Sequence, residues 1–359
     1  MVSETSRPVN AGSTPIIAGL SGMGARTPSI LVAAALLAAA PAAAQSAPTR
    51  RGPLPSRDEW LLAQPMLTLP AAAPDPLDHG ETEVRFDGDW GSDFAWVGGF
   101  GGPSGDLRYL VDGEHRSGSL TVRRGFGGGV TLGVRVPLLW RGPGILDGVI
   151  DWWHRAFGFP DGGRSFFPDN QFRVEGRDPS RRPIAWKGRA GTGLGNVELD
   201  VQHVITGRDD ARGWRTALAW CATLPTATGT FSGAGGGIGV QLLAAHPLGS
   251  RVDLYAGAGS AFNTRRTFQG ITYRRARPQG FLALEARVTH GWSAIAQLDA
   301  ASRLVTNLDS YPGSTIYLRV GSKFGLRHGW MLEGGITEGL IHQVAATDFG
   351  LIVGIARRF

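Results

Sequence analysis

Three polar residues in one segment have the types and the spacing of a cation site. In the stretch GILDGVIDWWHRAFGF, Asp147, Asp151 and His154 follow one another at i, i+4 and i+7, which places them on one face of a helix. Two carboxylates and an imidazole suit a divalent cation. The same helix would also carry an apolar stripe: Ile145, Leu146, Val149, Ile150 and Trp153. An amphipathic helix lying against another surface explains both faces, so we assign no metal and no other cofactor.

Motifs for enzymatic chemistry are absent from the sequence. Nucleophilic hydrolysis needs a serine activated by a nearby histidine, and no G-x-S-x-G segment occurs. There is no phosphate-binding G-x-x-x-x-G-K-[ST] loop, and the GTGLG segment lacks the third glycine of a dinucleotide site. The single cysteine, Cys221, excludes an internal disulfide and a multi-cysteine zinc site. The sequence therefore predicts a protein that is not an enzyme.

Most of the remaining sequence predicts β-strands, which would carry the loop that contains Asp147, Asp151 and His154. From Glu81 onward the sequence alternates polar and apolar residues with a period of two, in about a dozen segments separated by glycine-rich or polar breaks. We expect strands at roughly 81–97, 106–126, 129–139, 193–207, 213–225, 235–247, 251–262, 278–290, 291–301, 313–325, 328–339 and 346–359. Such alternation fits a sandwich or a barrel, and parity alone does not choose between them.

The N-terminal region predicts export. After Arg26 an apolar run leads to Ala42-Ala43-Ala44, which fits a cleavage site before Gln45. Residues 1–44 are therefore expected to be a signal peptide, with Met23 as an alternative start. Residues 45–80 are rich in proline and alanine without a sustained period, and we interpret them as a flexible periplasmic lead-in, a linker or plug-like segment. Residues 81–359 would form the β-domain.

Loop lengths and aromatic residues favour a membrane barrel over a soluble sandwich. Short connections such as FGGG and THGW alternate with long ones such as 138–192 and 263–277, as in outer-membrane barrels with short periplasmic turns and long extracellular loops. Aromatic and histidine residues recur on the apolar face near the short turns: Phe126, His203, Trp214, His246, His290, Trp292, Phe324, Trp330 and Phe359. They fit an interfacial girdle. The predicted fold is an all-β, antiparallel transmembrane barrel of about 12 strands, with a short helix in one long extracellular loop.

Two resemblances support this fold. The last strand ends on Phe359 behind alternating apolar residues, and this resembles the assembly signal of outer-membrane β-barrels, although Arg357 departs from the pattern. The resemblance implies the barrel-assembly machinery as a partner. More narrowly, the chain is similar to a proteobacterial family of unknown function with DGE, G-x-L-D-G-x-I and H-x-x-F-G-x-P-x-G-G-R segments. The matching residues are Asp112, Gly113, Glu114, Gly144, Leu146, Asp147, Gly148, Ile150, His154, Phe157, Gly158, Pro160, Gly162, Gly163 and Arg164. That family implies no activity.

Charged residues on the polar parity are candidates for the barrel lumen. They are Arg85, Asp112, Glu114, Arg123, Arg135, Glu198, Asp200, Arg215, Glu285, Arg287, Asp299, Arg319, Lys323 and Glu333. Both signs are mixed. Because a barrel of about 12 strands is narrow, these charges either line a small pore or close it with ion pairs, and the sequence does not choose.

Arginines in the predicted external loops are candidates for contacts with anions. The residues are Arg181, Arg182, Arg265, Arg266, Arg274 and Arg275. Guanidinium groups suit the phosphates of lipopolysaccharide, and they could also guide an anionic solute toward the mouth.

The sequence thus predicts an outer-membrane barrel of a Gram-negative bacterium whose partners are membrane lipid, lipopolysaccharide and a possible small solute, with no nucleic acid. The leading function is a narrow pore for small solutes, anionic ones among them. The first alternative is a structural or envelope-interaction barrel with a plugged lumen. An outer-leaflet hydrolase is the weakest alternative, since His203, His246 and His290 fall at the periplasmic ends of their strands.

Overall fold

Twelve antiparallel strands form a closed barrel, which confirms the predicted fold class. The computed structural model describes residues 51–98, 106–207, 213–340 and 346–359, so the expected signal peptide, residues 1–44 with Met23, lies outside the described residues. The barrel strands are β1 (Thr82–Val97), β2 (Tyr109–Phe126), β3 (Val130–Gly142), β6 (Glu198–Thr206), β7 (Arg215–Thr223), β8 (Gly237–Pro247), β9 (Val252–Asn263), β12 (Ala276–Arg287), β13 (Trp292–Ser302), β14 (Ser314–Gly325), β15 (Trp330–Gly339) and β16 (Thr347–Arg358).

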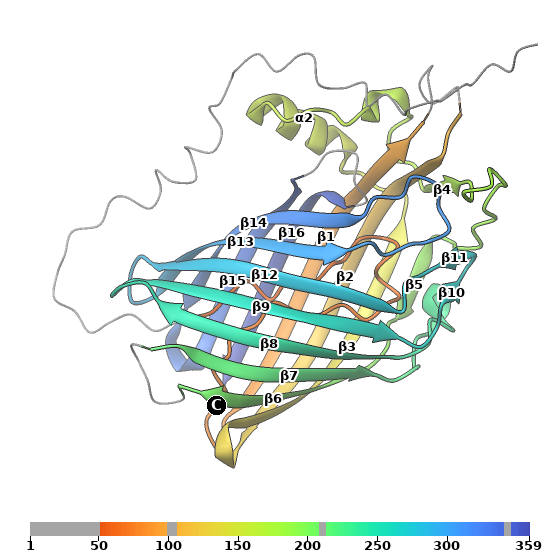
Figure 1. Ribbon diagram of the computed structural model, residues 1–359. Coiled ribbons are helices and arrows are strands. Elements are labelled where there is room, and N and C mark those ends of the chain that lie inside the picture. Colours follow the sequence, from red (N-terminus) through yellow and green to blue (C-terminus); the bar gives the residue numbers. More distant parts are fainter. Residues whose placement is uncertain (1–50, 99–105, 208–212, 341–345) are drawn as a thin grey trace, which may run out of the picture. The chain divides into compact units, whose positions relative to one another are not determined.

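The first and last strands close the ring (Figure 1). Each barrel strand pairs with its sequence neighbour, and β1 pairs with both β2 and β16. Phe86 lies opposite Ile355 and Val84 opposite Arg357, so the last strand closes the barrel against the first. The backbone of Phe359 exchanges two hydrogen bonds with Thr82. In the described structure every barrel strand is paired on both sides, as a membrane barrel requires.

The remaining elements belong to connections between barrel strands. Short strand β4 (Arg173–Gly176) pairs with β2, β5 (Gly191–Leu194) pairs with β3, and β10 (Thr267–Phe268) pairs with β11 (Ile271–Thr272). The α-helix α2 spans Asp147–Phe157, and short 3-10 helices occupy Gly127–Gly129, Arg164–Phe166, Gly229–Phe231 and Arg327–Gly329. Among the described residues, no helix is long and apolar enough to cross a membrane.

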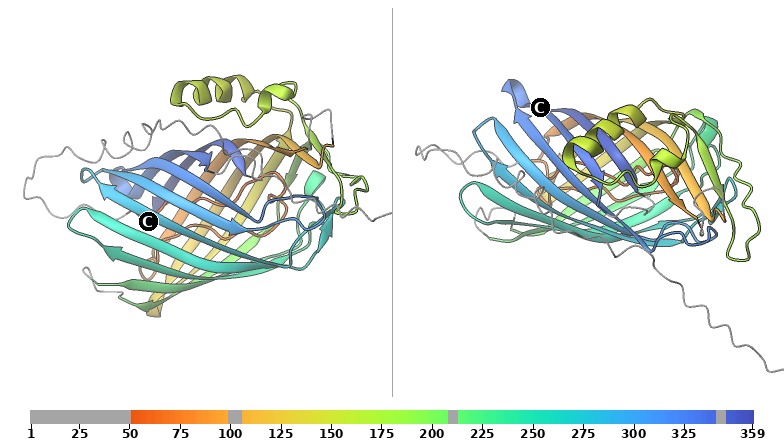
Figure 2. Two further views of the ribbon diagram at one scale, coloured as in Figure 1. Left: turned by 45° about the horizontal axis from the view of Figure 1, so that its top comes forward. Right: turned by 90° about the horizontal axis from the view of Figure 1, so that it is seen from above.

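The barrel has two unlike ends. Turns such as Gly127–Gly129 and Arg327–Gly329 mark one end, called here the short-turn end, where Phe359 also lies. The loops that contain α2, β4, β5, β10 and β11 mark the other, the long-loop end (Figure 2). This arrangement agrees with the loop lengths expected from the sequence.

Alternation along each strand gives the wall an apolar outside and a polar inside. On β2, Leu120 and Val122 are exposed, whereas Ser119 and Thr121 are buried. Exposed large apolar side chains recur on the other strands, from Phe86 on β1 to Val353 on β16. A soluble monomer rarely exposes so much contiguous apolar surface, whereas a barrel in lipid needs such a band.

The segment from 51 to 80, called here the inner segment, lies inside the barrel (Figure 1). It starts near the short-turn end, turns at 61–66 and returns to enter β1. Trp60, Leu61 and Leu62 are almost fully buried. For the described part of residues 45–80, the flexible lead-in is therefore wrong and the plug-like alternative applies, because this segment is fixed by many contacts with the wall.

An apolar cluster joins the inner segment to the long loops. Trp60, Leu62 and Met66 pack with Tyr273 and Tyr311 from two different loops. Further members are Leu61, Ala63, Ala95, Tyr109, Val111, Val174, Ala234, Phe268, Ile271, Leu304, Val305 and Leu308. Since several of these residues come from the loops after β9 and β13, the cluster fills the lumen at the long-loop end.

Candidate functional site: the barrel lumen and the outer-wall helix

The inner segment is anchored at its start by two charged residues of the wall. Glu285 on β12 accepts hydrogen bonds from the backbone N–H groups of Arg51 and Gly52, each at 3.0 Å. Lys323 on β14 donates to the backbone oxygen of Pro53 at 2.6 Å. Backbone groups that enter a barrel without a partner strand need such side-chain partners, and charged partners make these hydrogen bonds stronger.

Ion pairs hold the middle of the inner segment. Asp58 pairs with Arg277 on β12 and accepts a hydrogen bond from the hydroxyl of Tyr317 at 2.8 Å. Arg57 pairs with Glu198 on β6 at 2.5 Å. On the other side, Ser56 donates to Asp299 at 2.8 Å, so contacts reach several different strands.

The returning part of the inner segment bonds to a third group of strands. The backbone N–H of Leu67 donates to Asn263 at 2.9 Å, and that of Leu69 donates to Gln279 at 2.9 Å. Asp75 forms an ion pair with Arg215 on β7 at 2.6 Å. The inner segment is therefore attached along its whole length rather than only at its ends.

Most charged residues that the sequence assigns to the lumen either contact the inner segment or form ion pairs with residues of other wall strands. Glu198, Arg215, Glu285, Asp299, Arg319 and Lys323 contact the inner segment directly. Arg85 pairs with Glu333, Arg123 with Asp200 and Arg287 with Asp253. The mixed charges thus form a bonded network inside the barrel.

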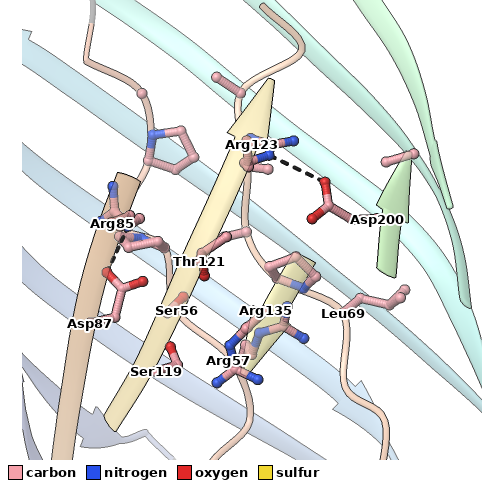
Figure 3. Close-up of a pocket in the computed structure, with 18 of the residues that line it drawn as sticks. Ser56, Arg57, Leu69, Arg85, Asp87, Ser119, Thr121, Arg123, Arg135 and Asp200 are labelled. Atoms are coloured by element: carbon pink, nitrogen blue, oxygen red, sulfur yellow. Dashed lines mark hydrogen bonds and ion pairs between the residues drawn. The ribbon is translucent and has the colours of Figure 1, made fainter. Parts of the chain in front are cut away.

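A cavity of about 190 Å³ remains beside the inner segment. Figure 3 shows Arg57 and Arg135 close together on one side of it, with Arg123 bonded to Asp200 on another. Equal numbers of charges of each sign line the cavity: Arg51, Arg57, Arg85, Arg123, Arg135, Lys323 and Arg358 against Glu59, Asp75, Glu83, Asp87, Asp89, Glu198 and Asp200. The lining is therefore nearly neutral overall.

Arg135 differs from the other arginines of the cavity. Within the described residues its guanidinium has no hydrogen bond or ion pair within bonding distance, although Arg57 beside it is bonded to Glu198. Its side chain is partly exposed to the cavity. Arg135 is therefore the lining cation that is most available to a solute.

Asp112 and Glu114 do not belong to the lumen. On β2 the odd-numbered residues from Ser117 to Arg123 line the cavity, whereas even-numbered residues such as Leu120 are exposed on the outside. Successive side chains of a strand point to opposite faces, so Asp112 and Glu114 lie on the outer face. Placing them with the lumen residues was an error of parity.

Glu114 binds the start of α2 on that outer face. Its Oε1 accepts hydrogen bonds from the backbone N–H groups of Ile145 and Leu146, at 2.5 and 2.6 Å. A carboxylate there satisfies N–H groups that have no partner within the helix and favourably meets the positive end of the helix dipole. A Cβ at Gly144 would lie 1.8 Å from Glu114 Oε1, so a larger residue there would displace this carboxylate.

Arg164 holds the segment after α2 against the same wall. Its guanidinium bonds to Asp147 Oδ1 at 2.5 Å and to Asp348 Oδ2 at 2.9 Å, and it lies over the ring of Phe94. Burial alone would lower the pKa of Arg164, but the carboxylates of Asp348 and Asp147 raise it above its ordinary value. This arginine therefore stays charged and ties the loop to β16.

The predicted group of Asp147, Asp151 and His154 is not brought together. Asp147 is used by Arg164 and by the backbone N–H of Asn170. Asp151 is partly exposed, and within the described residues no hydrogen bond or ion pair joins it to His154. The three residues lie on one helix, but their side chains do not contact a common partner.

One face of α2 packs on the outer wall of the barrel and the other is free (Figure 2). Leu146 and Ile150 pack on Phe349 of β16, so the helix covers this apolar residue of the outer face. On the other face Val149 and Trp152 are 48% and 59% exposed. The helix thus lies between the barrel wall and its surroundings.

The arginines expected to contact anions are all exposed near the long-loop end: Arg181, Arg182, Arg265, Arg266, Arg274 and Arg275.

At the short-turn end, Trp214 stacks on His246 and Trp292 on Phe324. Arg357 lies over the rings of Trp330 and Phe359. Its charge therefore sits at the rim among aromatic rings rather than in the middle of the apolar band.

A family comparison covers almost the whole chain. Residues 28–359 match the model of a family described as protein of unknown function (DUF3187). The chain is a DUF3187 protein. Among curated proteins, no sequence is significantly similar to this DUF3187 protein.

Solved structures similar to the DUF3187 chain include an outer-membrane channel, a toluene transporter and a porin. An outer-membrane channel from Pseudomonas putida F1 is 12% identical over 79% of this chain and 97% of its own, with a TM-score of 0.55. The toluene transporter TodX from P. putida is 11% identical over 88% of this chain and 99% of its own, with a TM-score of 0.41. The NanC porin is 8% identical over 77% and 97%, with a TM-score of 0.41. The first of these supports the barrel fold of the DUF3187 chain.

Proposed function

We propose that this protein is an outer-membrane channel for small solutes that its own inner segment holds closed. The observation that carries the proposal is the position of residues 51–80, which fill the lumen by side-chain contacts rather than as a strand of the wall. The barrel therefore does not depend on this segment for its ring of strands. A shift of the segment can widen the path while the wall stays intact.

The contacts of the inner segment fit a part that moves. Most of its polar anchors are individual hydrogen bonds and ion pairs to separate strands, such as Glu285 at the start and Arg215 near the end. Each of these polar contacts can be replaced by hydrogen bonds to water when the inner segment moves out of the lumen. The apolar cluster around Trp60 opposes this movement at the long-loop end, because separating it exposes apolar surface to water.

The charges around the cavity support weak rather than strong selectivity. Seven cationic and seven acidic residues line it, so the summed field along the path is small. The sequence suggests an anion preference through the exposed loop arginines, and the structure adds Arg135, which is unpaired within the described residues. We propose a slight preference for anions that depends on Arg135.

The orientation in the envelope follows from the two ends of the barrel. We propose that the short-turn end faces the periplasm and that the long loops face outward in a Gram-negative outer membrane. Arg181, Arg182, Arg265, Arg266, Arg274 and Arg275 would then lie near lipopolysaccharide phosphates. The aromatic rings at the short-turn end would meet the inner interface. We propose no enzymatic activity and no nucleic-acid partner.

The filled lumen also favours a second candidate, a structural barrel that never conducts. In that case the inner segment is a permanent core, comparable to the apolar interior of a soluble domain. Both candidates predict little conductance from the unaltered protein. They differ in the conductance expected once the anchors of the inner segment are weakened.

Planar-bilayer recording of the refolded full-length protein separates the candidates. We expect rare, brief openings from the unaltered chain and frequent openings from the double variant Asp58→Asn with Glu285→Gln, which weakens both anchors. Asp151→Asn on the outer helix is the matched control and should behave as the unaltered chain. A permanently silent double variant that is fully folded would contradict the channel. A steady large conductance from the unaltered chain would contradict the closed state.

A further inference from the structure

Three side chains from different elements converge beneath α2. His154 comes from the helix, Glu338 from the end of β15 and Asp348 from the start of β16. One potential ligand atom of each lies within 4.8 Å of the others. His154 Nε2 is 3.7 Å from Glu338 Oε1 and 3.8 Å from Asp348 Oδ1. The group joins the long loop that carries α2 to the rim of the barrel.

Two members of this group are buried and have no hydrogen bond to any residue that the structure describes. His154 is 3% exposed and Glu338 is 5% exposed. Both ring nitrogens of His154 and both carboxylate oxygens of Glu338 are enclosed without a hydrogen-bond partner in the described part of the chain. Buried polar groups are almost always bonded, and those that are not need an explanation such as a missing ion or water.

The distances within the group are too long for hydrogen bonds but suit a shared ion. Hydrogen bonds between nitrogen and oxygen rarely exceed about 3.2 Å. Ligand atoms about 2.1 Å from a tetrahedrally bound Zn²⁺ lie roughly 3.4 Å from one another. The observed separations of 3.7 and 3.8 Å are slightly above that value, so small rotations of the side chains would bring them into place.

We propose that His154, Glu338 and Asp348 bind one divalent transition-metal ion, for which Zn²⁺ is the best fit. Imidazole selects zinc and other transition metals over Ca²⁺ and Mg²⁺, and the two carboxylates supply charge and oxygen donors that zinc also accepts. Three protein ligands leave a fourth position for water. The ion joins α2 to β15 and β16, so its first role is to hold the loop on the outer wall.

Charges around the site favour a cation. Besides Glu338 and Asp348, Asp147 lies nearby and is paired with Arg164. Arg164 also binds Asp348 through Oδ2, which leaves Oδ1 directed toward His154. An outer partner that fixes one carboxylate oxygen while the other faces the ion is typical of metal sites. With neutral His154, these four charged groups carry a net negative charge before the ion binds.

The sequence signal for this site was incomplete. Helical spacing singled out His154 together with Asp147 and Asp151, but the two carboxylates that His154 meets are about 190 residues away along the chain. Only the pairing of β15 with β16 brings Glu338 and Asp348 near each other. A different pair of acids therefore completes the cation site that the helix pattern suggested.

Zinc titration of the refolded, chelator-treated full-length protein tests the proposal. Calorimetry should show one Zn²⁺ bound per chain, and Glu338→Gln or His154→Gln should remove this binding. Arg164→Lys should weaken it by about 10–100-fold, as expected for an outer partner. Asp151→Asn, on the same helix, is the matched control and should bind normally. Absence of stoichiometric binding would show that His154 only forms ion pairs with the two acids, which overturns the proposal.

Two further measurements keep the test independent of folding. Resistance of the barrel to unfolding in detergent without heating shows whether each variant has folded. Co²⁺ in place of Zn²⁺ should give the intense visible absorption of a four-coordinate site in the unaltered protein, and this absorption should vanish in folded Glu338→Gln. Binding that survives in folded Glu338→Gln and Asp348→Asn, or equal displacement of Zn²⁺ by Ca²⁺, would overturn the assignment.

Discussion

The hydroxyl of Tyr317 on β14 donates a hydrogen bond to Asp58 of the inner segment across 2.8 Å, and both side chains are buried. Arg277 on β12 completes the contact as an ion pair with the same carboxylate. Asp58 thus binds two wall strands at once from within the lumen. Removing one member of such a buried group leaves the remaining buried charge without a partner, which destabilises the folded state.

Asp58→Asn should therefore loosen the inner segment more than any other single change in it. Arg277 would keep its buried charge without a partner, and such losses cost about 3–5 kcal/mol. Tyr317→Phe removes only a hydrogen bond and should cost about 1 kcal/mol. The order of thermal unfolding midpoints, with Asp58→Asn lowest and Tyr317→Phe between it and the unaltered chain, checks this. Equal midpoints for all three would contradict the anchoring role.

Arg135→Ala should change the ion selectivity of the opened channel. Arg135 is the cavity arginine without a bonding partner among the described residues, whereas Arg123 is neutralised by Asp200. In the background of the opening variant, loss of the Arg135 charge should shift the reversal potential in a salt gradient toward cations. Arg123→Ala also deletes an arginine, but it frees Asp200 and should shift selectivity further. An unchanged reversal potential for Arg135→Ala would remove this residue from the path.

Trp152 should contact lipid. It is 59% exposed on the free face of α2, where neighbouring Val149 is also exposed. In liposomes with brominated acyl chains, the unaltered protein should lose more tryptophan fluorescence than Trp152→Phe. Trp60, fully buried in the lumen, provides the control, because Trp60→Phe should not reduce the quenched fraction. If Trp152→Phe and the unaltered protein are quenched to the same extent, α2 does not meet the membrane.

Much of the barrel could be predicted from local sequence alone. Period-two alternation in segments such as β16 follows directly from one face in lipid and one in the lumen, so the strands themselves were foreseeable. The boundaries differ by only a few residues, as for β12, which begins at Ala276 rather than at residue 278. A strand whose residues alternate between two environments shows that alternation in its sequence, so it can be recognised.

The inner segment could not be predicted in this way because it has no repeating environment. Its backbone is bonded to side chains such as Glu285 and Asn263 rather than to a neighbouring strand, so no period arises. Trp60 with Leu61 and Leu62, in a stretch otherwise rich in proline and alanine, was the available sign of burial. Parity also failed at Asp112 and Glu114, which are charged although they lie on the outer face, because the loop and α2 cover them.

The docking of α2 should depend on pH and on zinc in opposite ways. Burial alone would lower the pKa of His154, but Glu338 and Asp348 outweigh burial and raise it. A raised pKa in the docked state means that protonation favours docking. In the absence of metal, this stabilisation is fully present below the ordinary histidine pKa of about 6.5 and is lost as the pH rises through the raised value. Zn²⁺ needs neutral imidazole, so it should restore docking at pH 8 and compete with protons at pH 5.

Limited trypsin cleavage after Arg155, which is exposed on α2, measures this docking, with protease amounts adjusted for equal activity at each pH. Without metal, cleavage should be faster at pH 8 than at pH 6, and Zn²⁺ should slow it at pH 8. The charged groups that face His154 in the described structure include Glu338 from β15, Asp348 from β16, and Asp161 and Arg164 from the segment after the helix. His154→Gln should abolish both the pH response and the zinc response, whereas Asp151→Asn should keep both. A zinc effect that persists in His154→Gln would place the ion elsewhere.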